Sequence, residues 1–98
     1  MEVINPVHIM GRYGLHTFIP IKNPWEDQEE GKVELLIGES YYRLIGDNLD
    51  NPESLDLDGG PFMSIGSILL DHFTSEKYKI ESFDCHGKYP VLKCSKLP

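Results

Sequence analysis

The chain is short of basic residues: it has 98 residues, of which nine are Lys or Arg and sixteen are Asp or Glu, giving a formal net charge of −7. Nucleic-acid binding needs a basic footprint, and so does docking on an anionic membrane. We therefore expect neither nucleic acid nor membrane as a partner. The acidity suits a basic protein partner, and it is equally consistent with plain solubility.

Long hydrophobic runs are also missing, since none approaches the roughly 20 residues needed to cross a bilayer. The N-terminus, MEVINPVHIMGR, lacks the basic and then apolar regions of a secretory signal. From these two absences we expect a cytoplasmic protein. Composition and length fit one small globular β domain over residues 1–98, because 98 residues with 40% hydrophobic content can build one modest core.

Cysteine is scarce, with only Cys85 and Cys94 present. In a cytosolic protein these are expected to be free thiols. A tight turn at His86-Gly87 would also separate them along a hairpin by roughly 20 Å. A disulfide needs Cα atoms within about 7 Å, so the hairpin and the bridge are alternatives.

The chain is instead rich in short apolar segments divided by Gly, Pro and Asn. This pattern predicts an all-β, mainly antiparallel fold, a small barrel or sandwich of six to eight short strands. Pro6 makes the first strand an edge or broken strand. Gly38-Glu39 predicts a tight hairpin between the next two runs. The expected strands lie near residues 3–9, 15–21, 32–38, 40–46, 61–73, 77–84 and 89–94.

One short helical segment is expected near residues 24–30. Asn23 can cap it, Pro24 suits its first position, and Gly31 is a natural stop. Only Trp25 in this segment has a large apolar side chain to bury.

The stretch from Asp47 to Leu70 divides into an acidic and an apolar half. We expect residues 47–60 to form a largely exposed acidic loop, pinned to the domain by its leucines and binding no cation tightly. The apolar half continues to Phe73 as one bent strand or two, with Gly66 marking a bulge or corner. A helix from Ser67 is the alternative, and the interruption by Gly66 favours the strand.

No candidate metal or catalytic motif in the sequence has all the residues that such a site requires. The run from Ser54 to Gly59 imitates half of an EF-hand loop, but Ile65 stands where the bidentate glutamate belongs. Zinc sites use two close ligand pairs, whereas Cys85 and His86 are adjacent and point to opposite faces of a strand. We therefore expect no cofactor. No nucleophile elbow or phosphate-binding glycine motif occurs either.

The remaining signal concerns protein interaction. Aromatic anchors favoured in interfaces stand in polar surroundings, beside acidic residues of the 47–60 segment. The candidate binding residues are Trp25, Tyr41, Tyr42, Asp50, Asp56 and Asp58. The leading hypothesis is a non-catalytic protein-binding or regulatory module. Two alternatives stay open: a small metal- or thiol-dependent enzyme using the acidic residues or the Cys/His residues, and an acidic mimic of nucleic acid. The sequence leaves the oligomeric state open.

Overall fold

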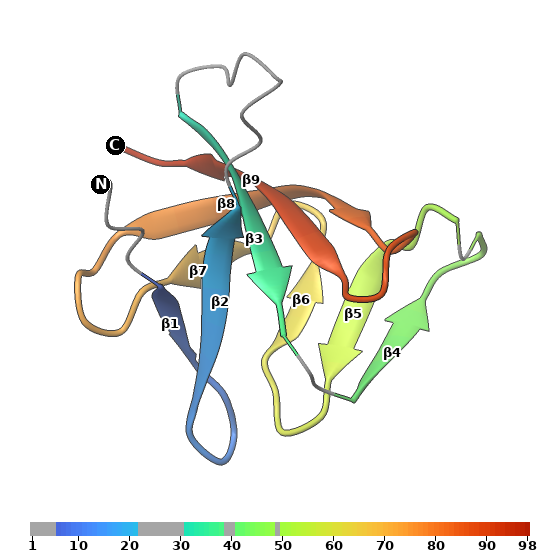
Figure 1. Ribbon diagram of the computed structural model, residues 1–98, viewed down its shortest axis with the longest axis horizontal. Helices are drawn as coiled ribbons and strands as arrows, with labels where there is room; N and C mark the ends of the chain where they lie inside the picture. Colours follow the sequence, from blue (N-terminus) through green and yellow to red (C-terminus); the bar gives the residue numbers. More distant parts are fainter. Residues whose placement is uncertain (1–5, 22–30, 39–40, 49) are drawn as a thin grey trace.

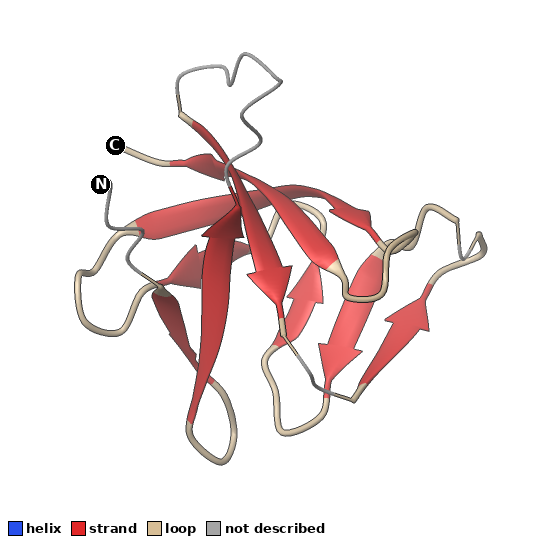
Figure 2. Cartoon of the chain, viewed as in Figure 1, coloured by secondary structure: helices blue, strands red, loops and turns tan. Residues whose placement is uncertain are grey.

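The computed structural model describes residues 6–21, 31–38, 41–48 and 50–98, and in these it contains nine strands and no helix (Figure 2). All the strand pairs are antiparallel, so the predicted all-β, antiparallel architecture is confirmed. The predicted helical segment near 24–30, with Trp25, lies outside the described residues. The strands are β1 (Val7–Met10), β2 (Leu15–Ile21), β3 (Lys32–Ile37), β4 (Tyr42–Ile45), β5 (Ser54–Leu57), β6 (Phe62–Ser64), β7 (Ile68–Leu70), β8 (Lys77–Asp84) and β9 (Val91–Lys96).

Six of the strands form one sheet in the order β1-β2-β3-β9-β8-β7. Its two edge strands meet at a single antiparallel bridge between Ile9 and Asp71, which nearly closes the sheet into a barrel (Figure 1). The other three strands form a separate sheet in the order β4-β5-β6, beside the barrel. The sequence predicted a small barrel or sandwich of six to eight strands. The described residues form nine strands, divided between a nearly closed barrel sheet and a second, smaller sheet.

One hydrophobic core serves both sheets. In the barrel strands, alternate residues such as Phe18, Leu35 and Ile80 are fully buried, as period-two alternation requires. The small sheet contributes Leu55 and Leu57 to the same cluster of buried residues. The small sheet is therefore fixed to the barrel by burial of one of its faces, and its other face is free for other roles.

The acidic segment 47–60 is not one exposed loop, as the sequence prediction had it. Its second half forms strand β5, in which Leu55 and Leu57 are fully buried and Asp56 between them points outward. The turn around Asp47 and Asp50 is exposed as expected, and so are Glu53 and Asp58 on either side of β5. The Leu-Asp-Leu alternation outweighs the repulsion between carboxylates, because each buried leucine stabilises the strand by roughly 1.5–3 kcal/mol.

The predicted hairpin through Gly38-Glu39 is wrong. β3 pairs with β2 and β9, whereas β4 pairs with β5 in the other sheet. The two apolar runs look alike locally, but the chain crosses from one sheet to the other between them. For residues 61–73 the strand prediction is confirmed as two strands, β6 and β7, separated by a turn in which Gly66 has φ of 89°.

The C-terminal hairpin of β8 and β9 is confirmed, but its tight turn at His86-Gly87 is wrong, because a longer loop joins Asp84 to Val91. The ladder also shifts register between Ile80 and Ser82, which places Cys94 opposite Ile80. Both cysteines are free thiols, as predicted.

Candidate functional site

The outward face of the β4–β5–β6 sheet gathers charged and aromatic side chains. Because Leu55 and Leu57 point into the core, Asp56 must point outward. Directly opposite it lie Arg43 on β4 and Phe62 on β6. The Arg43 guanidinium lies 3.6 Å from the Asp56 carboxylate, forming an exposed ion pair. Pairs of this kind contribute little stability, so their side chains can exchange partners cheaply.

The turn between β1 and β2 lies against the end of this face. The Arg12 N–H donates to the Gly59 carbonyl at 2.6 Å, which ties the turn to the residues after β5. Glycine permits this approach, because a Cβ on Gly11 would stand 2.7 Å from the same Gly59 oxygen. The contact places Arg12 near Asp56 of β5 and near Asp58, which follows the strand, and it places Tyr13 near Asp58.

A hollow of about 200 Å³ lies where these elements meet, and we call it the tyrosine–aspartate hollow. Two further hollows adjoin it. One of about 320 Å³ shares Asp58 with it. The other, of about 450 Å³, shares Arg12 and Asp56. Tyr13 lines the first and Phe62 the second. The tyrosine–aspartate hollow itself is lined by Arg12, Tyr41, Tyr42, Arg43, Asp56 and Asp58.

The groups around the hollow are available for binding. Tyr41 is 84% exposed and Tyr13 89% exposed, which is unusual for large aromatic side chains. In the described part of the chain, the Asp58 carboxylate and the Arg12 guanidinium have no hydrogen bond or ion pair. The site thus presents two aromatic rings, one unpaired anion and one unpaired cation, all ready to contact a partner.

Four of the residues selected from the sequence come together here: Tyr41, Tyr42, Asp56 and Asp58. Asp50 lies at the opposite end of the β4–β5 hairpin, where its N–H donates to the Asn48 side chain at 2.9 Å. Trp25 lies outside the described residues.

Sequence reasoning missed Arg12 and Tyr13. Their only local signal is the Gly-Arg-Tyr-Gly turn itself, which predicts a turn but not its contact with Gly59.

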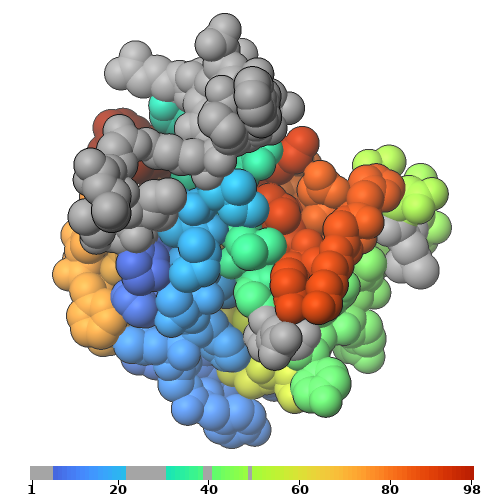
Figure 3. Space-filling view, in the orientation of Figure 1, coloured from blue at the N-terminus to red at the C-terminus, as the bar shows by residue number. Residues whose placement is uncertain are grey.

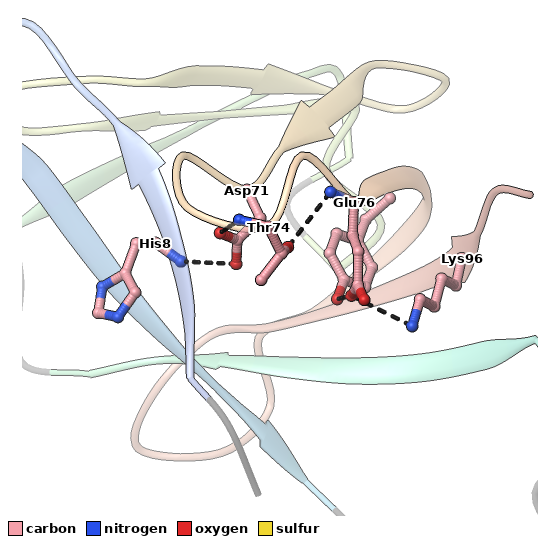
Figure 4. A network of polar contacts seen from close by, with 6 residues as sticks. His8, Asp71, Thr74, Glu76 and Lys96 are labelled. Carbon is pink, nitrogen blue, oxygen red and sulfur yellow. Dashed lines mark hydrogen bonds and ion pairs between the residues drawn. The ribbon is translucent and has the colours of Figure 1, made fainter.

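A second polar cluster lies at the barrel seam and is structural (Figure 4). The buried Asp71 carboxylate accepts hydrogen bonds from the N–H groups of His8, Phe73 and Thr74 at 3.3, 2.8 and 3.0 Å. Burial alone would raise the pKa of Asp71, but these three N–H donors and the nearby His8 bring it below its ordinary value. Asp71 therefore acts as an ionised cap that holds the turn after β7 against β1.

Glu76 continues this cluster outward (Figure 4). Its carboxylate accepts from the Tyr78 hydroxyl at 2.8 Å and pairs with Lys96 at 3.1 Å. Both contacts lower the pKa of Glu76. Desolvation and the neighbouring Glu76 raise the pKa of Tyr78, so its hydroxyl remains a donor at every physiological pH.

The thiols are poorly suited to nucleophilic chemistry. Desolvation raises the pKa of Cys94 to about 12, and desolvation together with Asp84 raises that of Cys85. A reactive cysteine needs a lowered pKa, because the thiolate is the nucleophile and the metal ligand. Within the described ranges, no three His, Cys, Asp or Glu side chains are grouped closely enough to hold a metal ion.

Comparison with models of protein families, with curated proteins and with solved structures finds no match to this chain. In the part of the chain that the structure describes, no helix is long and apolar enough to span a membrane. Any functional conclusion must therefore be drawn from the geometry of the site itself.

Proposed function

We propose that this protein is a non-catalytic binding module that recognises another protein through the tyrosine–aspartate hollow. The observation that carries this proposal is the convergence of exposed Tyr41 and Tyr13 with the unpaired Asp58 and Arg12 at one end of the β4–β5–β6 sheet. Tyrosine and arginine are enriched among the residues that dominate binding energy in protein interfaces.

The setting of these side chains favours binding over catalysis. Asp56 is already ion-paired with Arg43, and the hollow contains neither cysteine nor a histidine beside a nucleophile. A rigid aromatic side chain loses little conformational entropy when it is covered, so it contributes efficiently to an interface. The site therefore has the composition of an interface.

The charge of the chain supports a basic partner. A formal charge of −7 steers a positively charged partner toward the molecule and raises its association rate. Asp58 then supplies a specific contact for one cation of that partner. The proposal accordingly names a basic protein, bound through aromatic contacts with a central ion pair.

The test is affinity capture from the native host, with the partner identified by mass spectrometry and its affinity then measured with purified proteins. Tyr41→Ala and Asp58→Asn are each expected to weaken binding about 10- to 30-fold, the effect of losing an interface anchor worth roughly 2 kcal/mol. The matched controls lie outside the site: Phe73→Ala for the exposed ring and Asp50→Asn for the exposed carboxylate.

The controls are expected to bind like the unaltered protein. A partner whose affinity is insensitive to both Tyr41→Ala and Asp58→Asn would overturn the proposed site. Bound metal and turnover of a substrate, in the absence of any stoichiometric protein partner, would replace the binding module with the enzyme hypothesis.

A further inference from the structure

Strand β4 is an open edge of the small sheet. In the described part of the chain it pairs with β5 on one side and with nothing on the other. In Figure 1 it is the outermost strand, and Figure 3 shows its hairpin, in green, at the outer surface of the molecule. An open edge offers a row of hydrogen-bonding groups to any extended chain that can reach it.

The outward groups of β4 follow from its register. The Asp58 N–H donates to the Tyr41 carbonyl at 2.8 Å, so Tyr41 faces β5. Hydrogen-bonded positions alternate in an antiparallel pair, so Arg43 faces β5 as well. The N–H and C=O groups of Tyr42 and Leu44 therefore point away from the sheet, spaced to pair with an added strand.

The other strand edges are occupied or shielded. The edges of β1 and β7 meet at the Ile9–Asp71 bridge, and the His72 N–H donates to the His8 carbonyl beside it at 2.8 Å. The outer side of β6 faces the β1–β2 turn across the hollow that Met10 and Phe62 line. Of the described strands, β4 has the edge with room for an added strand.

Charge decides which extended chain fits this edge. Residues 41–58 carry five carboxylates against one guanidinium, a formal charge of −4. A second copy of this chain would bring the same net negative hairpin close to itself, and like net charges repel each other. Strand β4 itself carries Arg43 and no carboxylate. A lysine- or arginine-rich segment would be attracted by the net negative charge of the hairpin, and a cation near Tyr41 would reach the unpaired Asp58.

We propose that β4 binds an extended, basic segment of the partner protein as a fourth strand of the β4–β5–β6 sheet. This inference rests on the proposed function, because the added strand lies beside the tyrosine–aspartate hollow. Main-chain hydrogen bonds to Tyr42 and Leu44 supply the register. The side chains of the segment then reach Tyr41 on the outward face, and its cations reach the acidic groups.

The test uses three synthetic peptides with the intact protein. The first alternates lysine and valine, the second alternates glutamate and valine, and the third repeats the first with N-methyl groups on alternate amides. The lysine peptide is expected to slow hydrogen exchange at the Tyr42 and Leu44 amides by about tenfold or more, because these amides become hydrogen-bonded. Added salt is expected to weaken the binding of the lysine peptide, because it screens the charges.

The glutamate peptide and the N-methylated peptide are expected not to slow exchange at these amides. Failure of the lysine peptide to bind, or binding without slower exchange at Tyr42 and Leu44, would overturn the inference. These measurements are made on the unaltered protein, so they do not depend on the folding of any variant.

A pair of substitutions separates the edge from the side chain. Tyr42→Pro removes an outward N–H without removing a bond to β5, whereas Tyr42→Ala keeps the N–H and removes the ring. The affinity for the lysine peptide is expected to fall at least tenfold further in the proline variant than in the alanine variant, a difference of about 1.4 kcal/mol in binding free energy. Equal losses of affinity in the two variants would contradict binding at the β4 edge.

The native partner distinguishes the two proposals. If it is lost with Tyr41→Ala but retained with Tyr42→Pro, the binding module stands and strand addition falls. If it is insensitive to Tyr41→Ala and Asp58→Asn while the lysine peptide still protects β4, the proposed site falls and the edge stands as a separate interface.

Discussion

Ile9 and Asp71 form an antiparallel bridge that connects the two edges of the six-stranded sheet. The backbone of Asp71 makes this bridge, and its carboxylate accepts the N–H of His8 beside Ile9. The same carboxylate holds the turn that follows β7. A single buried side chain thus stabilises both the turn and the closure of the barrel.

Replacement of Asp71 by alanine is expected to destabilise the protein. The change leaves the N–H groups of His8, Phe73 and Thr74 without their acceptor, at a cost of roughly 3 kcal/mol in the free energy of unfolding. Urea denaturation measures it. Asp84→Ala is the matched control, because Asp84 accepts one exposed hydrogen bond from the His86 N–H. This variant is expected to lower the free energy of unfolding by less than about 1 kcal/mol. Equal effects would contradict a structural role for Asp71.

The contribution of Asp71 is expected to depend on pH in the acid range. Its pKa is lower in the folded state, so its ionised form stabilises the fold above the unfolded pKa of about 4, and this stabilisation disappears as pH falls through the folded pKa. The stability difference between the unaltered protein and Asp71→Asn is therefore expected to be constant near neutral pH and to shrink below about pH 4. Denaturation curves over a pH series measure it, and a difference that persists undiminished in acid would show that ionisation is irrelevant.

Gly11→Ala is expected to disturb the contact between the β1–β2 turn and Gly59. The added Cβ would lie 2.7 Å from the Gly59 oxygen and from the His16 ring, so the turn must move, at a cost of roughly 1–3 kcal/mol. The Arg12 amide signal is expected to shift, because its bond to Gly59 lengthens. Gly38→Ala is the control, since nothing lies within 4 Å of its Cβ position, and its effect is expected within about 0.5 kcal/mol.

The two thiols are expected to react slowly and unequally in the native protein. Cys94 is 2% exposed with a pKa of about 12, whereas Cys85 is partly exposed with a smaller rise in pKa. A thiol-specific reagent near neutral pH is expected to modify Cys85 first and to reach Cys94 only on unfolding. Titration of denatured, unreduced protein should count both thiols. Faster reaction at Cys94 would contradict its placement in the core.

The sequence predicted strands correctly where apolar and polar residues alternate along a short run. Short apolar runs between Gly and Pro predicted the antiparallel β fold. Free thiols were expected from a cytosolic setting and from the hairpin that would hold the two cysteines apart, and both are free although the turn of that hairpin differs. Tyr41, Tyr42, Asp56 and Asp58 were selected as binding candidates, and they lie around one hollow. The Leu55-Asp56-Leu57 alternation is the pattern of a strand, but the many carboxylates of segment 47–60 led to the prediction of a loop.

Tertiary structure alone decided which strands pair and which side chains from distant segments meet. The two runs on either side of Gly38 have similar patterns, yet β3 joins the barrel and β4 joins the small sheet. Arg12 lines the same hollow as Asp56 and Asp58 only because its turn packs on Gly59. A period-two pattern is a property of neighbouring residues and can be seen in the sequence. Strand pairing and the meeting of loops depend on closing long stretches of chain around a shared core, and no short stretch of sequence records that outcome.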